Sequence, residues 1–212
     1  MKWWNHLWCS SAKPASHVFG RIHLTLPEWT EVTPTKGMRV WRDTDGDVLS
    51  LANSPVPFTD SDQTDEMKVR KWCREIAQSS GGGLIEAHRL DIGIKLIYKR
   101  LDMPAYVYTG MLITHVRALW LIWTIVAGER GTTGVLEAVV TANLINDGKL
   151  KPEEYELRWG QDPYDPANRS VDRRILRFMS DDESYDVQFP QHPLSKVRRV
   201  LAALPGKVKY HS

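Results

Sequence analysis

The sequence has little cysteine, little net charge and no long hydrophobic run. Its two cysteines, Cys9 and Cys73, lie far apart in a chain of 212 residues, which argues against a disulfide framework and fits a reducing compartment. The net charge of +2 is too small to indicate the concentrated basic face of a nucleic-acid-binding protein. The apolar run at 118–127 is far shorter than the ~20 residues of a membrane-spanning helix.

The beginning of the chain also lacks the pattern of a secretion signal. No long apolar segment follows Lys2, because polar residues interrupt the tryptophans there, and Trp8 stands where a lipoprotein signal has a small residue before its cysteine. We therefore expect a cytoplasmic protein. The chain carries no cofactor-binding motif and no spacing typical of metal ligands, so we expect neither a cofactor nor a metal.

The most distinctive feature present is a pair of apolar segments at 105–114 and 118–127. Both are rich in Tyr, Val, Ile, Trp and Thr, which favour strands, and in both segments the two alternating faces are apolar. This pattern predicts the central strands of a sheet that is covered on both sides. Trp120 and Trp123 fall on opposite faces, and we expect them to be buried against different helices.

Shorter alternating segments and two helical patterns surround this pair. Val69, Cys73 and Ile76 share one face of the first helix, and a group of glycines at 81–83 ends it. Pro193 suits the first turn of a last helix. The further expected strands span 18–26, 38–42, 48–53, 84–90 and 94–100, and the expected helices span 64–79, 135–146 and the residues from Pro193 onward.

This order of elements predicts an α+β protein. We expect a mainly antiparallel sheet of about six or seven strands with helices packed on its faces, an α/β/α sandwich. The expected organisation is an irregular segment over 1–17, a sandwich domain over 18–148, and a segment over 149–212 that wraps the same domain as a belt and ends in a helix.

The order of elements resembles the PsbP-like fold, which also occurs in small bacterial DcrB-like proteins. The resemblance covers about residues 18–146 and rests on the LPEW segment at 26–29, the Asp-Gly hairpin at 45–46, the long helix after it, and the central strand with Gly110 that leads to a late helix. It implies a non-enzymatic role, since the family includes photosystem assembly factors, Ran-binding proteins and chaperones or adaptors of bacterial secretion. The tail from Lys149 onward departs from the compact form of the family.

Asp43, Asp45 and Asp47 resemble the start of a calcium-binding loop. An EF-hand loop requires a glycine at its sixth position and a glutamate at its twelfth. Here Gly46 is fourth and Ser54 is twelfth. A hairpin turn, for which Asp-Gly is well suited, is therefore the better interpretation.

A glycine-rich segment before the second helix is a candidate anion-binding site. Arg130, Gly131, Thr132 and Thr133 could hold an anion at the free N–H groups of the helix. The Gly-Lys-Ser/Thr ending of a phosphate-binding P-loop is absent. A structural turn in which the threonines cap the helix is the favoured alternative.

One acidic cluster suggests enzymatic chemistry. Asp181, Asp182, Glu183 and His192 could hold a metal or act as acid and base in a hydrolase. Their spacing matches no known ligand or nucleophile pattern, and the hypothesis requires the four side chains to converge in a cleft.

Nine tryptophans are the strongest compositional anomaly. Such residues either cap the sheet faces or anchor a partner, and we expect another protein as the partner. Our leading hypothesis is a non-catalytic bacterial protein-binding protein, namely an adaptor, chaperone or immunity-type protein of a toxin or secretion system, that holds its partner against one sheet face; the hydrolase is the alternative. The candidate partner-binding residues are Trp3, Trp4, Trp8, Trp159, Tyr164, Arg173 and Arg174, although the arginines could instead pair with Asp172, Asp181 and Asp182.

Overall fold

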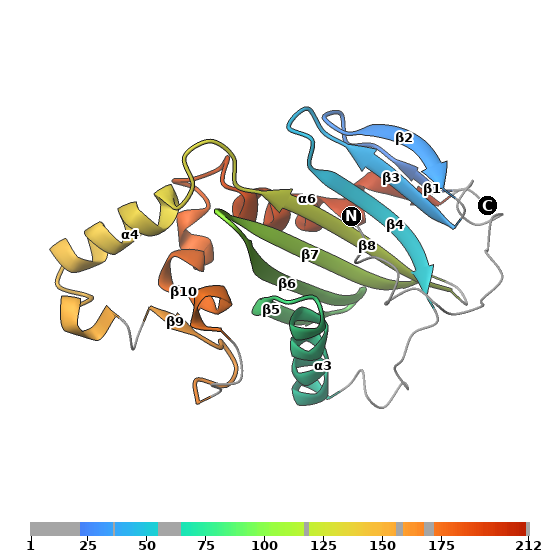
Figure 1. The fold of residues 1–212 in the computed structure, drawn as a ribbon. Coiled ribbons are helices and arrows are strands. Elements are labelled where there is room, and N and C mark those ends of the chain that lie inside the picture. The colour runs from blue at the N-terminus through green and yellow to red at the C-terminus, as the bar shows by residue number, and fades with distance from the viewer. Residues whose placement is uncertain are drawn as a thin grey trace.

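The computed structural model describes residues 22–35, 37–54, 65–116, 119–155, 159–167 and 172–210. Its main element is a seven-stranded antiparallel sheet with the order β2-β3-β4-β8-β7-β6-β5 (Figure 1). The expected α+β class is confirmed. The strands are β2 Thr30–Thr35, β3 Met38–Arg42, β4 Val48–Ser54, β5 Gly83–Leu90, β6 Gly93–Asp102, β7 Ala105–Val116 and β8 Leu119–Gly128.

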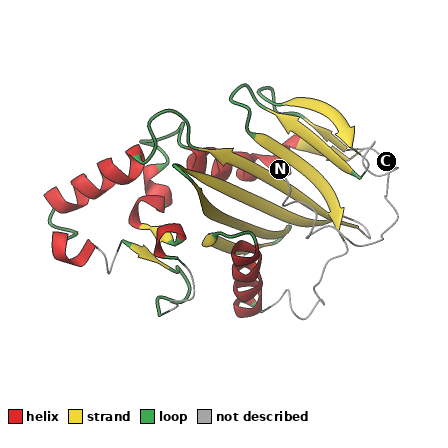
Figure 2. Cartoon of the chain, in the orientation of Figure 1, coloured by secondary structure: helices red, strands yellow, loops and turns green. Residues whose placement is uncertain are grey.

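Two long helices pack on opposite faces of this sheet. Helix α6, Pro193–Lys207, contacts β7 and β8, and helix α3, Glu66–Ser79, contacts β5 and β6 on the other face (Figure 2). A third helix, α4, spans Val135–Asn146 and extends beyond the end of the strands (Figure 1). None of the described helices is long and apolar enough to cross a membrane.

The central hairpin of β7 and β8 forms the core on both faces, as its sequence predicts. On the α6 face Leu112 lies opposite Trp123, whose indole is 1% exposed and stacks on Trp41 at 5.7 Å between ring centroids. Trp120 points to the other face, beside His115, and is half-buried there. Full burial is therefore limited to Trp123, because α3 lies over β5 and β6 and not over β8.

The N-terminal strands differ from the prediction. Strand β1 covers only Ile22–Leu24 and pairs with β11, Val208–Tyr210, at the other end of the chain, outside the main sheet; residues 18–21 lie outside the described residues. Strand β2 was not expected from the sequence, since Pro34 interrupts its alternation. Its position at the edge of the sheet explains how it accommodates a proline.

Where the structure describes the segment between α4 and α6, it contains short elements. They are η1 Pro152–Glu154, β9 Gly160–Gln161, η2 Arg173–Ile175, β10 Arg177–Phe178, η3 Met179–Asp181 and η4 Glu183–Tyr185, and β9 pairs with β10 (Figure 1).

Specific contacts attach this segment to the sheet. The Arg74 guanidinium on α3 binds the Asp162 carboxylate at 2.7 Å. The segment also passes so close to β5 that a Cβ at Gly83 would stand 2.1 Å from the carbonyl oxygen of Ile175. Only glycine fits at that position without moving the backbone.

Candidate functional site

Helix α4 has an inverted charge pattern. Its only charged residue, Glu137, lies on the half-buried side, where both carboxylate oxygens are buried without a hydrogen-bond partner among the described residues. The face that points to solvent carries no charge, and its exposed residues are the apolar Val135, Ala138, Val139, Ala142 and Ile145 and the polar Asn143 and Asn146. The solvent-facing side of a helix normally carries charged residues, so an outward side without any charge is unusual. The exposed fractions of Val135, Val139 and Ile145 are 43%, 39% and 36%, so this face is open in the isolated chain.

Beneath the first turn of α4, two glutamates that are close in sequence meet a distant histidine. Glu129 follows β8, Glu137 belongs to α4, and His192 precedes α6. One carboxylate oxygen of each glutamate and one ring nitrogen of His192 lie within 4.8 Å of one another. The sequence gives no sign of this group, because none of the three positions shares a motif with the others.

Glu129 joins β7 to the start of α4. Its Oε2 accepts a hydrogen bond from the Tyr106 N–H at 2.9 Å, and its Oε1 accepts one from the Gly134 N–H at 3.0 Å. Burial opposes ionisation of Glu129, but the nearby His192 ring and the hydrogen bonds from these two N–H groups hold its pKa below its usual value. Gly134 has a φ of 73° and is the N-cap residue of α4.

His192 is fixed from two sides. Its Nδ1 accepts a hydrogen bond from the Leu194 N–H at 3.3 Å, which makes it the N-cap residue of α6. Its ring meets the Tyr108 ring edge-on at 5.2 Å between centroids. Its Nε2 is buried, has no hydrogen-bond partner among the described residues, and lies 3.8 Å from the Glu129 Oε1.

A fully buried ion pair lies next to this group. The Lys99 ammonium contacts the Asp181 carboxylate at 2.5 Å and the Phe178 ring at 3.2 Å, and both charged side chains are completely inaccessible. Desolvation lowers the pKa of Lys99, and the charge of Asp181 opposes this shift. Desolvation raises the pKa of Tyr108 well above its usual value, and the charges of Asp181, Glu137 and Glu129 raise it further.

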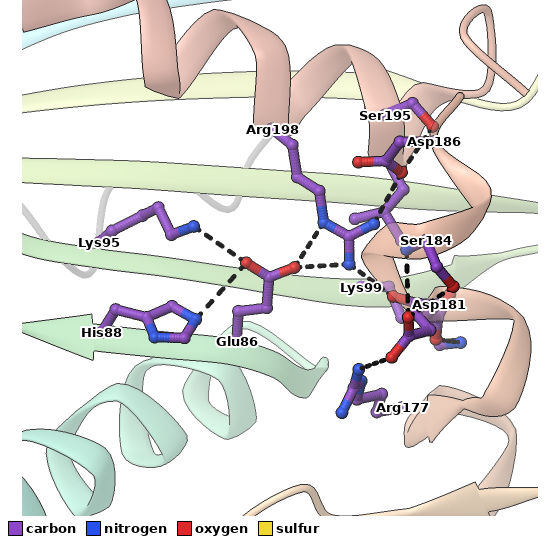
Figure 3. Close-up of polar contacts among 12 residues, drawn as sticks. Glu86, His88, Lys95, Lys99, Arg177, Asp181, Ser184, Asp186, Ser195 and Arg198 are labelled. Atoms are coloured by element: carbon purple, nitrogen blue, oxygen red, sulfur yellow. Dashed lines mark hydrogen bonds and ion pairs between the residues drawn. The ribbon is translucent and has the colours of Figure 1, made fainter.

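A second charged network connects β5 to α6 (Figure 3). Glu86 binds the Arg198 guanidinium and, at 3.1 Å, the Lys95 ammonium. Arg198 also donates to Asp186 at 2.8 Å, and Ser195 donates to the same carboxylate oxygen. Each charge has an opposite partner, so the network fastens the segment before α6 to the sheet and presents no activated nucleophile.

The cysteine of α3 is not a nucleophile either. Burial raises the pKa of the Cys73 thiol to about 12, so the thiolate is not formed near neutral pH.

The aspartates between β3 and β4 form the predicted hairpin turn. Gly46 takes a φ of 84° in this turn. The Lys196 ammonium of α6 lies 2.5, 2.6 and 2.7 Å from carboxylate oxygens of Asp43, Asp45 and Asp47, respectively. The lysine ammonium thus lies where a calcium ion would bind. The hairpin interpretation of the sequence is confirmed.

The candidate anion-binding segment lies at the rim of a cavity of about 520 Å³ that His192 and Lys196 also line. The Arg130 guanidinium pairs with Asp47, which reduces the positive charge available to an anion. Gly131 has a φ of 69°. The prediction that Thr132 and Thr133 cap α4 is wrong, because Gly134 is the N-cap residue and no side chain caps the helix. Anion binding here stays a prediction.

The acidic cluster of the hydrolase hypothesis does not converge. Asp181 pairs with Lys99, Asp182 pairs with Arg177 at 3.0 Å, and Glu183 is exposed. His192 instead faces Glu129 and Glu137. In the described part of the chain these residues form no common group of ligand atoms, so the geometry does not favour the hydrolase.

The aromatic candidates that the structure describes have structural roles. Trp159 is 6% exposed and stacks between Tyr155 and Phe178, with centroid distances of 5.1 and 5.7 Å. The Tyr164 hydroxyl accepts a hydrogen bond from the Ala87 N–H and donates one to the Ala87 carbonyl. Trp3, Trp4 and Trp8 lie outside the described residues.

The arginine candidates point to solvent. Arg173 and Arg174 are exposed, and the Arg174 guanidinium binds Asp172 at 2.6 Å, which is the alternative pairing that the sequence allows. A contact surface formed by these arginines stays a prediction.

Comparisons with known proteins give a structural likeness and no sequence family. No protein-family model matches the chain, and no curated protein matches its sequence. The chain resembles the Ran-binding protein Mog1p of Saccharomyces cerevisiae, with 9% identity, a TM-score of 0.45 and 91% of each chain covered. It also resembles a mutant of the protein Mog1, with 8% identity, a TM-score of 0.46, and 91% of this chain and 92% of that chain covered. At these values neither likeness supports an argument about function.

Proposed function

We propose that the protein is a non-catalytic protein-binding protein and that the outward face of α4 docks its partner. The supporting observation is the inverted charge pattern of this helix, which exposes Val135, Val139 and Ile145 while its one charge points inward. Single exposed apolar side chains are common on protein surfaces. A contiguous uncharged face along a whole helix is not, and it indicates a surface that a partner covers.

The shape of this face fits an amphipathic helix of another protein. The 12 residues of α4 give a stripe about 18 Å long. Ala138 and Ala142 lie one turn apart on its exposed side, between larger apolar side chains. Small residues at this spacing allow a second helix to approach closely, while Val135, Val139 and Ile145 supply apolar contact on either side.

The size of the face favours a different protein over a second copy of this chain. Exposed apolar patches of a few hundred Å² are often functional on monomers. A stable dimer interface buries about 800 Å² on each partner, and five small or medium side chains on three turns of helix supply less than that. A helix docked on α4 would give a weaker, reversible contact, as adaptors, chaperones and immunity-type proteins of toxin or secretion systems require.

The sheet face expected from the sequence is a less open surface. On the α3 side of β4 and β8 the apolar side chains of Val48, Ile122 and Val126 are half-buried, whereas the outward side chains of α4 are exposed. A bound partner would cover either the α4 face or this sheet face. The surface that becomes covered on binding therefore decides between the two.

The experiment compares two exposed valines. Val139→Glu places a charge in the α4 face, and Val187→Glu places the same charge at an 89% exposed valine in another segment. Because both side chains are exposed, both variants fold. We expect Val139→Glu to weaken partner capture from host extract about fivefold or more, since central interface residues contribute more than about 1 kcal/mol, and Val187→Glu to leave it unchanged.

Three results would contradict the proposal. Equal capture by both variants would place the docking surface elsewhere. Sedimentation that shows a dimer which Val139→Glu dissociates would identify the partner as a second copy. Turnover of a panel of hydrolase substrates by the purified protein, with no partner captured, would favour the hydrolase.

A further inference from the structure

The inward side of α4 presents a set of metal-ligand atoms. Glu129, Glu137 and His192 come from a loop, a helix and a helix N-cap, and their ligand atoms lie within 4.8 Å of one another. Two carboxylates and one imidazole form a donor set that suits Zn²⁺ and related divalent transition metals. As whole residues all three are partly buried. The side chains of Glu129 and His192 alone are only 5% and 9% exposed.

A second observation points to a ligand at this place. The Tyr108 side chain is 0% exposed, yet its hydroxyl has no hydrogen-bond partner among the described residues. Its ring packs edge-on against the ring of His192, whose Nε2 is itself buried without a hydrogen-bond partner among the described residues. Both carboxylate oxygens of Glu137 are unpartnered as well. Buried polar atoms are nearly always satisfied in folded proteins, so several of them at one point indicate that something binds there.

We propose that Glu129, Glu137 and His192 bind one divalent transition-metal ion, and Zn²⁺ is the ion that this donor set suits best. Ligand atoms bound to Zn²⁺ at about 2.0–2.2 Å lie roughly 3.4 Å apart in a tetrahedral site. The His192 Nε2 and the Glu129 Oε1 are already 3.8 Å apart, so rotation of the Glu137 side chain completes most of the closure.

In a nearby acidic cluster, a lysine of the protein supplies the positive charge. Asp43, Asp45 and Asp47 surround the Lys196 ammonium at 2.5–2.7 Å, so their charges are neutralised. Neither carboxylate oxygen of Glu137 has a hydrogen-bond partner among the described residues, and the buried Lys99 ammonium is bound to Asp181 at 2.5 Å. Glu137 is therefore the carboxylate that still requires a cation.

Metal binding changes the tautomer of His192. Without metal, Nδ1 accepts from the Leu194 N–H, so in the neutral ring the proton is on Nε2. A metal on Nε2 requires the proton to move to Nδ1, which ends this hydrogen bond. The bond is long, at 3.3 Å, and three metal–ligand bonds outweigh it. The change of tautomer is a signature that a structural role of His192 alone does not produce.

The test uses the full chain, stripped of metal and titrated with Zn²⁺, with Mn²⁺ and Ca²⁺ in parallel. His192→Asn keeps a side chain that caps a helix, and Glu137→Gln keeps the size of the side chain, so both retain the local packing. Asp45→Asn is the matched control in the cluster that Lys196 occupies. Equilibrium dialysis with elemental analysis measures the stoichiometry and the Kd, and circular dichroism checks the fold of each variant.

We expect one Zn²⁺ per chain in the natural sequence, and weaker binding of Ca²⁺. His192→Asn and Glu137→Gln should raise the Kd for Zn²⁺ by at least about 100-fold, beyond the effect of residues that only support a ligand, and Asp45→Asn should leave it unchanged. The ¹⁵N spectrum of labelled His192 in the natural sequence should show the proton move from Nε2 to Nδ1 when Zn²⁺ is added.

The proposal is overturned if no Zn²⁺ binds, if His192→Asn binds it as tightly as the natural sequence, or if Asp45→Asn abolishes binding. An unchanged His192 tautomer in the presence of bound Zn²⁺ overturns it as well, without any variant. Val139 points away from this site. Partner docking and metal binding can therefore fail or succeed independently.

Discussion

Helices α3 and α4 both bury an apolar stripe against the domain, but their outward sides differ in charge. Each buries a stripe of three residues, which are Val69, Cys73 and Ala77 in α3 and Leu136, Val140 and Leu144 in α4. The outward side of α3 carries Lys68, Lys71 and Glu75, whereas the outward side of α4 carries no charge. The buried stripe therefore attaches a helix to its domain, and the composition of the outward side distinguishes a helix that faces water from one that faces a partner.

The two helices also rest on different supports. Helix α3 lies on apolar side chains of the sheet, such as Leu84 and Leu96, and the Asp65 side chain caps its first turn at Met67 and Lys68. Helix α4 packs on Trp159 and Phe178, but its first turn lies over the buried carboxylates and has no side-chain cap. Apolar packing thus attaches both helices, and the two differ at their first turns, where α3 has a side-chain cap and α4 lies over buried carboxylates.

The largest expected effect concerns the buried ion pair next to α4. Asp181→Ala leaves the Lys99 ammonium buried without its partner, and we expect a loss of about 3–5 kcal/mol in the free energy of unfolding. Urea denaturation followed by tryptophan fluorescence measures this loss. A double variant, Asp181→Leu with Lys99→Met, should recover most of it, because no unpaired charge remains. If the double variant is as unstable as the single one, packing and not charge supports this region.

A smaller effect should be equal in the two helices. Val69 and Val140 are 1% and 0% exposed, and truncation of either to alanine removes the same apolar volume. We expect Val69→Ala and Val140→Ala each to destabilise the protein by about 2 kcal/mol through lost burial and a small cavity. Thermal and urea unfolding measure both. A much smaller cost for Val140→Ala would show that the stripe of α4 contributes little, and the comparison of the helices would then fail.

The smallest expected effect is at the cap of α3. The Asp65 carboxylate accepts hydrogen bonds from the N–H groups of Met67 and Lys68 at 3.0 and 3.3 Å. Asp65→Ala should cost about 1 kcal/mol, and Asp65→Asn, which keeps an acceptor, should cost less. Hydrogen exchange of the first turn of α3 localises the loss. Equal costs for the two substitutions would mean that the cap bond does not stabilise the helix.

Much of the fold could be predicted from the sequence because its elements carry strong periodic patterns. The helix expected over 135–146 has the same bounds as α4, and the two central strands appear at 105–116 and 119–128. Strand β2 could not be predicted, since Pro34 breaks its pattern and only its position at the sheet edge tolerates a proline. The short elements between α4 and α6 have no period from which to predict them.

Less of the candidate sites than of the fold could be predicted from the sequence. Of the aromatic residues singled out for partner binding, Trp159 is buried and Tyr164 is half-buried, because a large ring that can reach a core packs there whether or not a partner exists. The three-aspartate hairpin could be recognised as a turn, but its cation, Lys196, comes from the last helix. The pairing of Arg174 with Asp172 was predictable as an alternative, since the two residues are close in sequence.

The sequence by itself determined the class of the fold, the central strands and the position of each long helix, because local periodicity decides which face of an element is apolar. The tertiary structure alone decided that Glu137 points inward toward Glu129 and His192, and that the opposite face of α4 remains uncovered. These properties arise from contacts between segments far apart in the chain. The role of a charge or of an apolar face therefore depends on what packs against it.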